Sequence, residues 1–162
     1  MNAAAGRQKM TEVEHLQEVV KRLRAEDSCP WDRVQTHESL KPPVIEEAAE
    51  VIGGINILKE TGDNRNLEEE LGDLLLQVVM QSAIAEEEDL FTLDDVAREA
   101  SEKMIRRHPN AFGNAEEETD WESIKAQAHH GREWEKDYLP GAFQEAQELI
   151  VRAMDRKGIK GK

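Results

Sequence analysis

Residues 67–80 have the apolar spacing of a long helix that is buried on more than one side. The apolar positions recur three and four residues apart, and they cover a wider arc than contact with one neighbouring helix requires. We therefore expect this helix to pack between several others, some of them from another subunit. The apolar residues of the segment are Leu67, Leu71, Leu74, Leu75, Val78, Val79 and Met80.

Local signals predict helices along most of the chain. Thr11 with Glu14, and Thr92 with Asp95, have the three-residue spacing of a capping box at the start of a helix. Asn66 is a further candidate cap, and no segment alternates in the manner of a strand. The expected helices cover about residues 11–25, 44–59, 66–88, 92–107, 120–134 and 140–156.

These helices predict an all-α fold. A chain of 162 residues has room for one compact domain, and its aromatic content of 4% argues against a β-sandwich. We expect a helical bundle whose four-helix core is completed by dimerisation, in a homodimer or a dimer of dimers.

The charge and composition exclude several classes of protein. The chain has 35 acidic and 21 basic residues and a formal charge of −14, which repels a nucleic-acid backbone. No apolar run reaches the roughly 18 residues that a membrane span needs, and the N-terminus has no signal-peptide pattern. A single cysteine, Cys29, cannot form an internal disulfide. We expect a cytoplasmic protein that binds neither nucleic acid nor membrane.

Two of the expected helices carry acidic pairs that share a helix face. Glu47 and Glu50 lie three residues apart in the helix expected over residues 44–59. Glu70 and Asp73 lie three residues apart in the helix expected over residues 66–88. Such pairs are common in an acidic chain, where they usually form a solvated face. These pairs instead border the apolar stripes, so antiparallel packing of the two helices through their stripes would bring four carboxylates together.

Four carboxylates in one place need a cation. Each like-charge pair at about 5 Å costs about 3 kcal/mol at an effective dielectric constant of about 20. A site with only oxygen ligands favours a hard ion, so we expect Mg²⁺, with Mn²⁺ as a substitute. A di-iron centre is excluded, because no histidine follows any of these acids at the required spacing.

The two acidic pairs and their separation resemble the metal-binding motif of the MazG family of all-α nucleoside triphosphate pyrophosphohydrolases. The resemblance covers about residues 16–125. Several separate motifs in the order of the family are much less probable by chance than a single motif. The other matching motifs are Cys29-Pro30-Trp31-Asp32 with Gln35-Thr36, Leu71-Gly72-Asp73-Leu74-Leu75, Lys103-x-x-Arg106-Arg107-His108-Pro109, and Trp121-x-x-x-Lys125.

The resemblance implies Mg²⁺-dependent hydrolysis of ordinary or damaged nucleoside triphosphates to the monophosphate and pyrophosphate. Water attacks the α-phosphorus, and the bound ion neutralises phosphate charge. The implied roles are metal ligation by Glu47, Glu50, Glu70 and Asp73, water activation by Glu46, phosphate binding by Lys103, Arg107 and Lys125, and base stacking by Trp121.

Several of these residues also fit ordinary structural roles. Cations in a last helical turn, such as Lys103 and Arg107, complement the helix dipole. Trp121 on its own resembles a packing anchor, and Cys29 has no local base that would make it a nucleophile. For the whole chain, the alternatives are a non-catalytic helical module that binds nucleotides or proteins, and a pyrophosphohydrolase of a phosphoribosyl nucleotide.

The resemblance also sets the expected domain division. Residues 139–158 resemble the connector between two such domains in longer members of the family, and no second domain follows in this sequence. We therefore expect a flexible N-terminus over residues 1–10, a MazG-like catalytic domain over 11–135, and a connector-like C-terminal helix and tail over 136–162.

Overall fold

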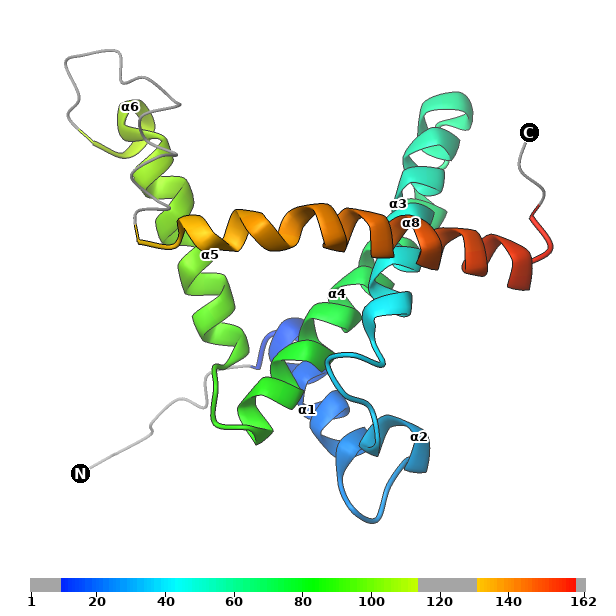
Figure 1. The fold of residues 1–162 in the computed structure, drawn as a ribbon, viewed down its shortest axis with the longest axis horizontal. Coiled ribbons are helices and arrows are strands. Elements are labelled where there is room, and N and C mark those ends of the chain that lie inside the picture. Colours follow the sequence, from blue (N-terminus) through cyan, green and yellow to red (C-terminus); the bar gives the residue numbers. More distant parts are fainter. Residues whose placement is uncertain (1–9, 114–130, 160–162) are drawn as a thin grey trace, which may run out of the picture.

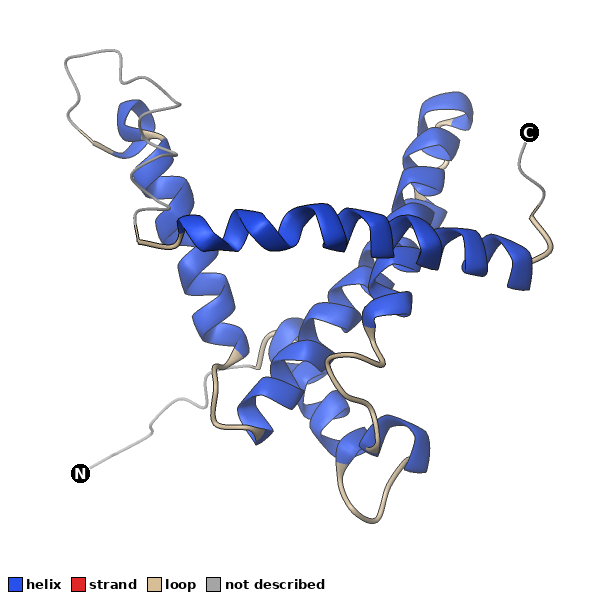
Figure 2. Cartoon of the chain, viewed as in Figure 1, coloured by secondary structure: helices blue, strands red, loops and turns tan. Residues whose placement is uncertain are grey.

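A computed structural model describes residues 10–113 and 131–159 of the chain. All regular structure in these two ranges is helical, which confirms the all-α prediction (Figures 1 and 2). None of the helices described has the length and apolar composition needed to cross a bilayer. The elements are α1 (Glu12–Arg24), α2 (Pro30–Arg33), α3 (Lys41–Thr61), α4 (Arg65–Glu87), α5 (Leu93–Arg107), α6 (Pro109–Phe112), the 3-10 helix η1 (Glu133–Tyr138) and α8 (Leu139–Arg156).

The two predicted capping boxes are confirmed. The Thr11 hydroxyl accepts a hydrogen bond from the Glu14 backbone at 3.2 Å, and the Glu14 carboxylate accepts one from the Thr11 backbone at 2.6 Å. Thr92 and Asp95 make the same reciprocal pair at the start of α5. The signal is reliable because the whole interaction lies within four residues of the chain.

Several helix boundaries differ from those expected. The prediction that Asn66 caps a helix is wrong: α4 begins at Arg65, and Asn66 lies in its first turn. The α3 helix begins at Lys41, three residues before the expected start, and includes Pro42 and Pro43. The first helical turn tolerates these prolines because their missing backbone donors have no partner there. The short α2 helix lies between the expected helices over residues 11–25 and 44–59, where no helix was predicted. Most of the helix expected over residues 120–134 lies outside the described residues.

The α3 and α4 helices form the central hairpin of the fold (Figure 1). Gly62 ends α3 in a left-handed conformation (φ 77°), and its backbone N–H donates to the Leu58 carbonyl at 2.9 Å. The α1 helix packs on α4, and α8 packs on α3. The core lies toward the C-terminal end of α4, and its buried residues are Val20, Leu40, Val79, Met80, Ala83 and Ile84.

The α3 and α4 backbones come very close at Gly54. This glycine is buried, and a Cβ atom built on it would lie only 2.8 Å from the Leu67 Cα. The neighbouring Gly53 has no such restriction, since a Cβ there would meet nothing within 4 Å. Of these two adjacent glycines, only Gly54 lies where the α3 and α4 backbones approach closely.

Arg24 joins α1 to α4, to α2 and to the loop before α3. Its side chain is only 5% exposed and makes two hydrogen bonds of 2.7 Å with the Glu87 carboxylate. It also donates to the backbone carbonyls of Asp32 (2.8 Å) and Gln35 (3.3 Å). The bond from Arg24 lowers the pKa of Glu87 below its usual value. One arginine therefore fixes three segments of the chain.

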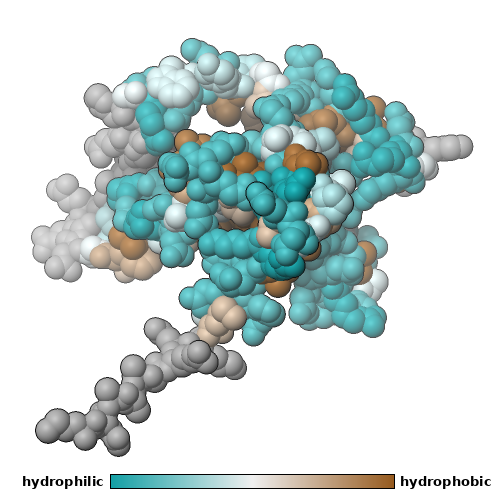
Figure 3. Space-filling view, turned by 90° about the horizontal axis from the view of Figure 1, so that it is seen from below, coloured by the Kyte–Doolittle hydropathy of each residue, from teal (hydrophilic) through white to brown (hydrophobic). Residues whose placement is uncertain are grey.

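Much of the apolar surface of the central helices stays exposed. The stripe expected on α3 is largely uncovered, with Ile52 61% exposed and Ile55 49% exposed. In α4, Leu71 and Leu75 are exposed, although Val79 and Met80 are buried. Figure 3 shows hydrophobic side chains among the polar surface. Within residues 10–113 and 131–159, the chain therefore covers only one side of the predicted wide apolar arc.

The close approach at Gly54 predicts opposite effects for two neighbouring substitutions. Gly54→Ala should lower the free energy of unfolding by about 1–3 kcal/mol, because its methyl group forces the α3 and α4 backbones apart. Gly53→Ala should raise it by about 0.5–1 kcal/mol, because alanine favours the helix and has room. Urea unfolding monitored by circular dichroism measures both. Equal effects of the two changes would contradict the close-contact interpretation.

The contacts of Arg24 predict a large effect from a single substitution. Arg24→Ala should lower the free energy of unfolding by about 2–3 kcal/mol, because it removes a buried side chain together with its bonds to Glu87 and to two part-buried carbonyls. Arg22→Ala, which breaks an exposed pair with Asp27, should cost less than about 1 kcal/mol. Because the folded-state pKa of Glu87 is lowered, the stabilising pair is lost as pH falls through that pKa. The difference between wild type and Arg24→Ala in urea unfolding should therefore shrink in acid.

Candidate metal centre

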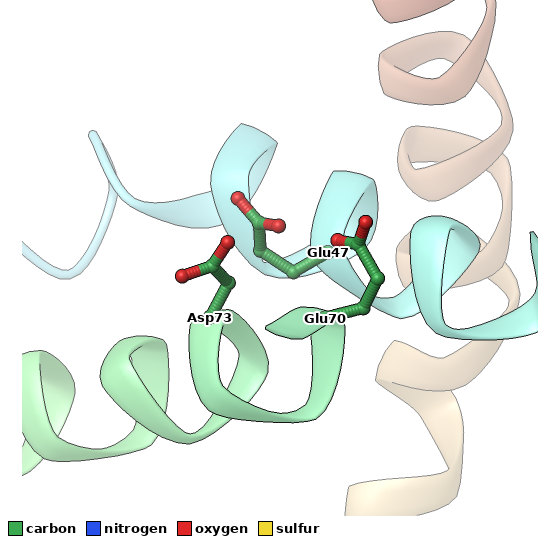
Figure 4. Close-up of side chains that lie close together, drawn as sticks. All are labelled: Glu47, Glu70 and Asp73. Atoms are coloured by element: carbon green, nitrogen blue, oxygen red, sulfur yellow. The ribbon is translucent and has the colours of Figure 1, made fainter. Parts of the chain in front are cut away.

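Three acidic side chains from the central hairpin meet in one place. Glu47 comes from α3, and Glu70 and Asp73 come from α4; one carboxylate oxygen of each lies within 4.8 Å of the others. Figure 4 shows the three side chains directed into the space between the two helices. The antiparallel hairpin therefore brings together acids that are more than twenty positions apart in the sequence.

The electrostatics of this cluster disfavour the ionised form of Glu47. Burial raises the pKa of Glu47 above its usual value, and the negative charges of Asp73, Glu70 and Glu46 raise it further. The positive charge of Lys157 acts in the opposite direction. A cation among the carboxylates would relieve both the repulsion and part of the desolvation cost.

The donor set fits a hard divalent cation. Within the described ranges, the cluster offers carboxylate oxygens and neither histidine nor cysteine. Mg²⁺ and Mn²⁺ prefer oxygen ligands of this kind. Glu70 is also held in position, because the Asn66 side-chain amide donates to its Oε1 at 2.9 Å. Glu47, Glu70 and Asp73 are thus the residues that would hold such an ion.

The fourth predicted ligand, Glu50, has a different partner. It lies one turn after Glu47 on α3, but its Oε1 forms an ion pair with the Nζ of Lys157, at the end of α8. Glu46, the predicted water-activating residue, forms an ion pair with Arg156. The α8 helix thus brings two cations to the edge of the acidic cluster.

Sequence reasoning missed three residues around this cluster. The helical spacing of Asn66 and Glu70 would have indicated their contact, had Asn66 been placed inside the helix. No local signal points to Arg156 and Lys157, because Arg156 is 110 positions from its partner Glu46. A basic end of a helix ordinarily complements the helix dipole, and nothing in the sequence gives these two cations a second role.

The structure does not bring the predicted phosphate-binding cations to the carboxylates. Lys103 and Arg107 lie one turn apart on α5, and both are half-buried. The α5 helix packs against α4 and α6 but not against α3, and its first turn contacts the core through Leu93. Figure 1 shows the rest of α5 diverging from the central hairpin. Trp121 and Lys125 lie outside the described residues.

Comparison with known proteins identifies the family. The profile of the MazG nucleotide pyrophosphohydrolase domain matches residues 35–112, which include the acids of the hairpin and the cations of α5. The nucleoside triphosphate pyrophosphohydrolase/pyrophosphatase MazG of Thermotoga maritima is 49% identical over 116 residues, which are 70% of this chain and 44% of that protein. The nucleoside triphosphate pyrophosphohydrolase of Escherichia coli K12 is 38% identical over 125 residues, 73% of this chain and 46% of that protein.

A third relative is the uncharacterized protein YabN of Bacillus subtilis, which is 44% identical over 113 residues, 66% of this chain and 22% of that protein. The matched region thus spans less than half the length of each of these three relatives. It nevertheless contains the hairpin with its converging carboxylates. The domain match and these relatives agree with the motifs of the sequence, and the chain belongs to the MazG family.

Proposed function

We propose that this chain hydrolyses nucleoside triphosphates to the nucleoside monophosphate and pyrophosphate, with Mg²⁺ as its cofactor. The observation that carries the proposal is the convergence of Glu47, Glu70 and Asp73 within 4.8 Å inside a MazG domain. The names of the Thermotoga maritima and Escherichia coli relatives support the reaction class. Mn²⁺ should substitute for Mg²⁺, because it accepts the same oxygen ligands.

The acidic residues of the hairpin have separate roles in the attack of water on the α-phosphorus. Glu47, Glu70 and Asp73 hold the ion, and Glu50 joins them as the fourth ligand. When bound, Mg²⁺ neutralises phosphate charge, orients the triphosphate and makes a water more acidic. Glu46, whose side chain is only 13% exposed beside these ligands, orients the attacking water or accepts its proton.

The basic residues bind the substrate. Lys103 and Arg107 share a face of α5, so both amine and guanidinium can contact one triphosphate and stabilise the charge of the departing pyrophosphate. Trp121 stacks on the base and Lys125 contacts a phosphate. The pocket around the base then decides which ordinary or damaged nucleotides are cleared from the pool.

The active form is a homodimer, alone or within a dimer of dimers. The apolar stripes of α3 and α4 remain exposed, and Met104 and Ile105 on α5 are exposed as well. A symmetric partner that covers these faces would complete a four-helix core. In such an assembly, α5 of one subunit brings Lys103 and Arg107 to the carboxylates of the other.

The metal centre can be tested with two adjacent glutamates. Glu70→Gln should reduce pyrophosphate release at least about 100-fold, because it removes a charged ligand of the ion. Glu69→Gln is the matched control, since Glu69 is exposed and lies outside the cluster. Pyrophosphate release from a panel of triphosphates, with and without Mg²⁺, measures the effect, and circular dichroism checks folding.

Three outcomes would contradict parts of this assignment. A fully active Glu70→Gln protein would exclude the carboxylate cluster as the metal centre. A fully active Glu50→Gln protein would remove Glu50 from the ligand set. Binding of the triphosphate with Mg²⁺ but no turnover of any substrate would identify the chain as a nucleotide-binding module.

Mixing two inactive variants tests whether the site is shared between subunits. Glu70→Gln and Lys103→Ala proteins are each expected to be inactive, and subunit exchange should restore about a quarter of the wild-type turnover. This happens because a mixed dimer with a shared site has one intact combination of Glu70 and Lys103. Two variants that both carry Glu70→Gln provide the control. A mixture that forms mixed dimers and stays inactive would place both residues in one subunit's site.

A further inference from the structure

The end of α8 contacts the acidic face of α3 through two ion pairs. Arg156 pairs with Glu46, and Lys157 pairs with Glu50. Both acids belong to the first half of α3, where Glu47 contributes to the carboxylate cluster. The positive charge of Lys157 also acts on Glu47. It favours a lower pKa of this residue, although burial and the neighbouring acids raise that pKa overall. The basic end of α8, defined as Arg156 and Lys157, is therefore an electrostatic part of the cluster.

The Glu50 carboxylate cannot bind both Lys157 and a metal ion fully at the same time. While Glu50 pairs with Lys157, the three other acids alone form the close group of oxygens. The pair is accessible to water, with side-chain exposures of 41% for Lys157 and 36% for Glu50. An ion pair so exposed contributes little stability, so a divalent cation can displace the ammonium group.

The rest of the α8 contact involves few fully buried side chains. Ala153 is its only buried residue in the part of the chain described. An open pocket of about 310 Å³ lies between the N-terminal half of α8 and the helices α3 and α4, and its lining includes Val44, Gln81 and Leu149. Lys41 and Glu145 form an ion pair across this region at 3.2 Å. The helix is thus held on α3 by ion pairs and by the packing of its C-terminal half around Ala153.

We propose that the basic end of α8 is an intrinsic counter-ion of the metal centre, which holds Glu46 and Glu50 until a divalent cation takes Glu50 from Lys157. The inference rests on the proposed function in one respect, that Glu50 is a metal ligand. Because coupling between two binding events is reciprocal, the basic end lowers the affinity for the metal, and the metal weakens the contact of the basic end with α3. The position of α8 therefore depends on the occupancy of the centre.

Mn²⁺ binding to the full chain without nucleotide tests the competition. Lys157→Gln should tighten Mn²⁺ binding about threefold, as counted by the electron paramagnetic resonance signal of free Mn²⁺. Arg152→Gln is the matched control, because it removes the same charge from the same helix and Arg152 pairs with Glu148 on α8 itself. Its Mn²⁺ affinity should equal that of wild type. Equal affinities of wild type and Lys157→Gln would overturn the inference.

A double-mutant cycle shows whether Lys157 acts through Glu50. In a Glu50→Gln background, Lys157→Gln should leave the Mn²⁺ affinity unchanged, because the contested carboxylate is gone. An equal gain in both backgrounds would mean a general charge effect and would overturn the inference. So would an unchanged Mn²⁺ affinity with a raised KM for the triphosphate, which would identify Lys157 as a phosphate contact.

The two proposals fail in different ways. Loss of Mn²⁺ binding and of pyrophosphate release in Glu70→Gln, with no effect of Lys157→Gln on Mn²⁺ affinity, would overturn the counter-ion role and leave the proposed function intact. No Mn²⁺ binding by the wild type or by any variant would overturn both.

Discussion

The structure depends on the contact between α3 and α4, which brings like charges together while it buries apolar surface. Gly54 lets the two backbones meet, and this contact places Glu47 opposite Glu70 and Asp73. Repulsion between these carboxylates opposes the hairpin. The opposing cost is tolerable because the buried core lies toward the other end of α4, around Val79 and Met80. One end of the hairpin thus stabilises the fold, and the other end presents a site for a cation.

Contacts from distant parts of the chain complete both ends of this hairpin. At the core end, Arg24 of α1 binds Glu87, the Asp32 carbonyl of α2 and the Gln35 carbonyl of the following loop, so it fixes the segment that leads into α3. At the acidic end, Arg156 and Lys157 of α8 neutralise Glu46 and Glu50. Arg24 is buried and structural, whereas Arg156 and Lys157 are exposed to water and exchangeable. This difference in burial separates a permanent ion pair from one that a metal can replace.

The accuracy of the sequence predictions follows the range of the interactions. The capping boxes of Thr11 and Thr92 are correct because both partners lie within one helical turn. The acidic pairs were recognisable for the same reason, and their convergence required only a hairpin of two neighbouring helices. The partner of Glu50 was not predictable, since it lies at the end of the last helix and depends on how α8 crosses α3. The exposure of the apolar stripe of α3, including Ile52, was not predictable, because periodicity marks an apolar face without showing what covers it.

The charge of the centre explains why carboxylates alone are not sufficient for the proposed reaction. A divalent cation on three or four carboxylates leaves the centre negative, in a chain whose formal charge is already −14. A triphosphate is also negative, so its binding needs cations from elsewhere in the protein. Lys103 and Arg107 have the right chemistry, but α5 does not pack against α3 within the described chain. In the proposed homodimer, the exposed apolar faces of α3, α4 and α5 would therefore bear on catalysis as well as on stability, because the subunit that covers them would also supply the missing positive charge.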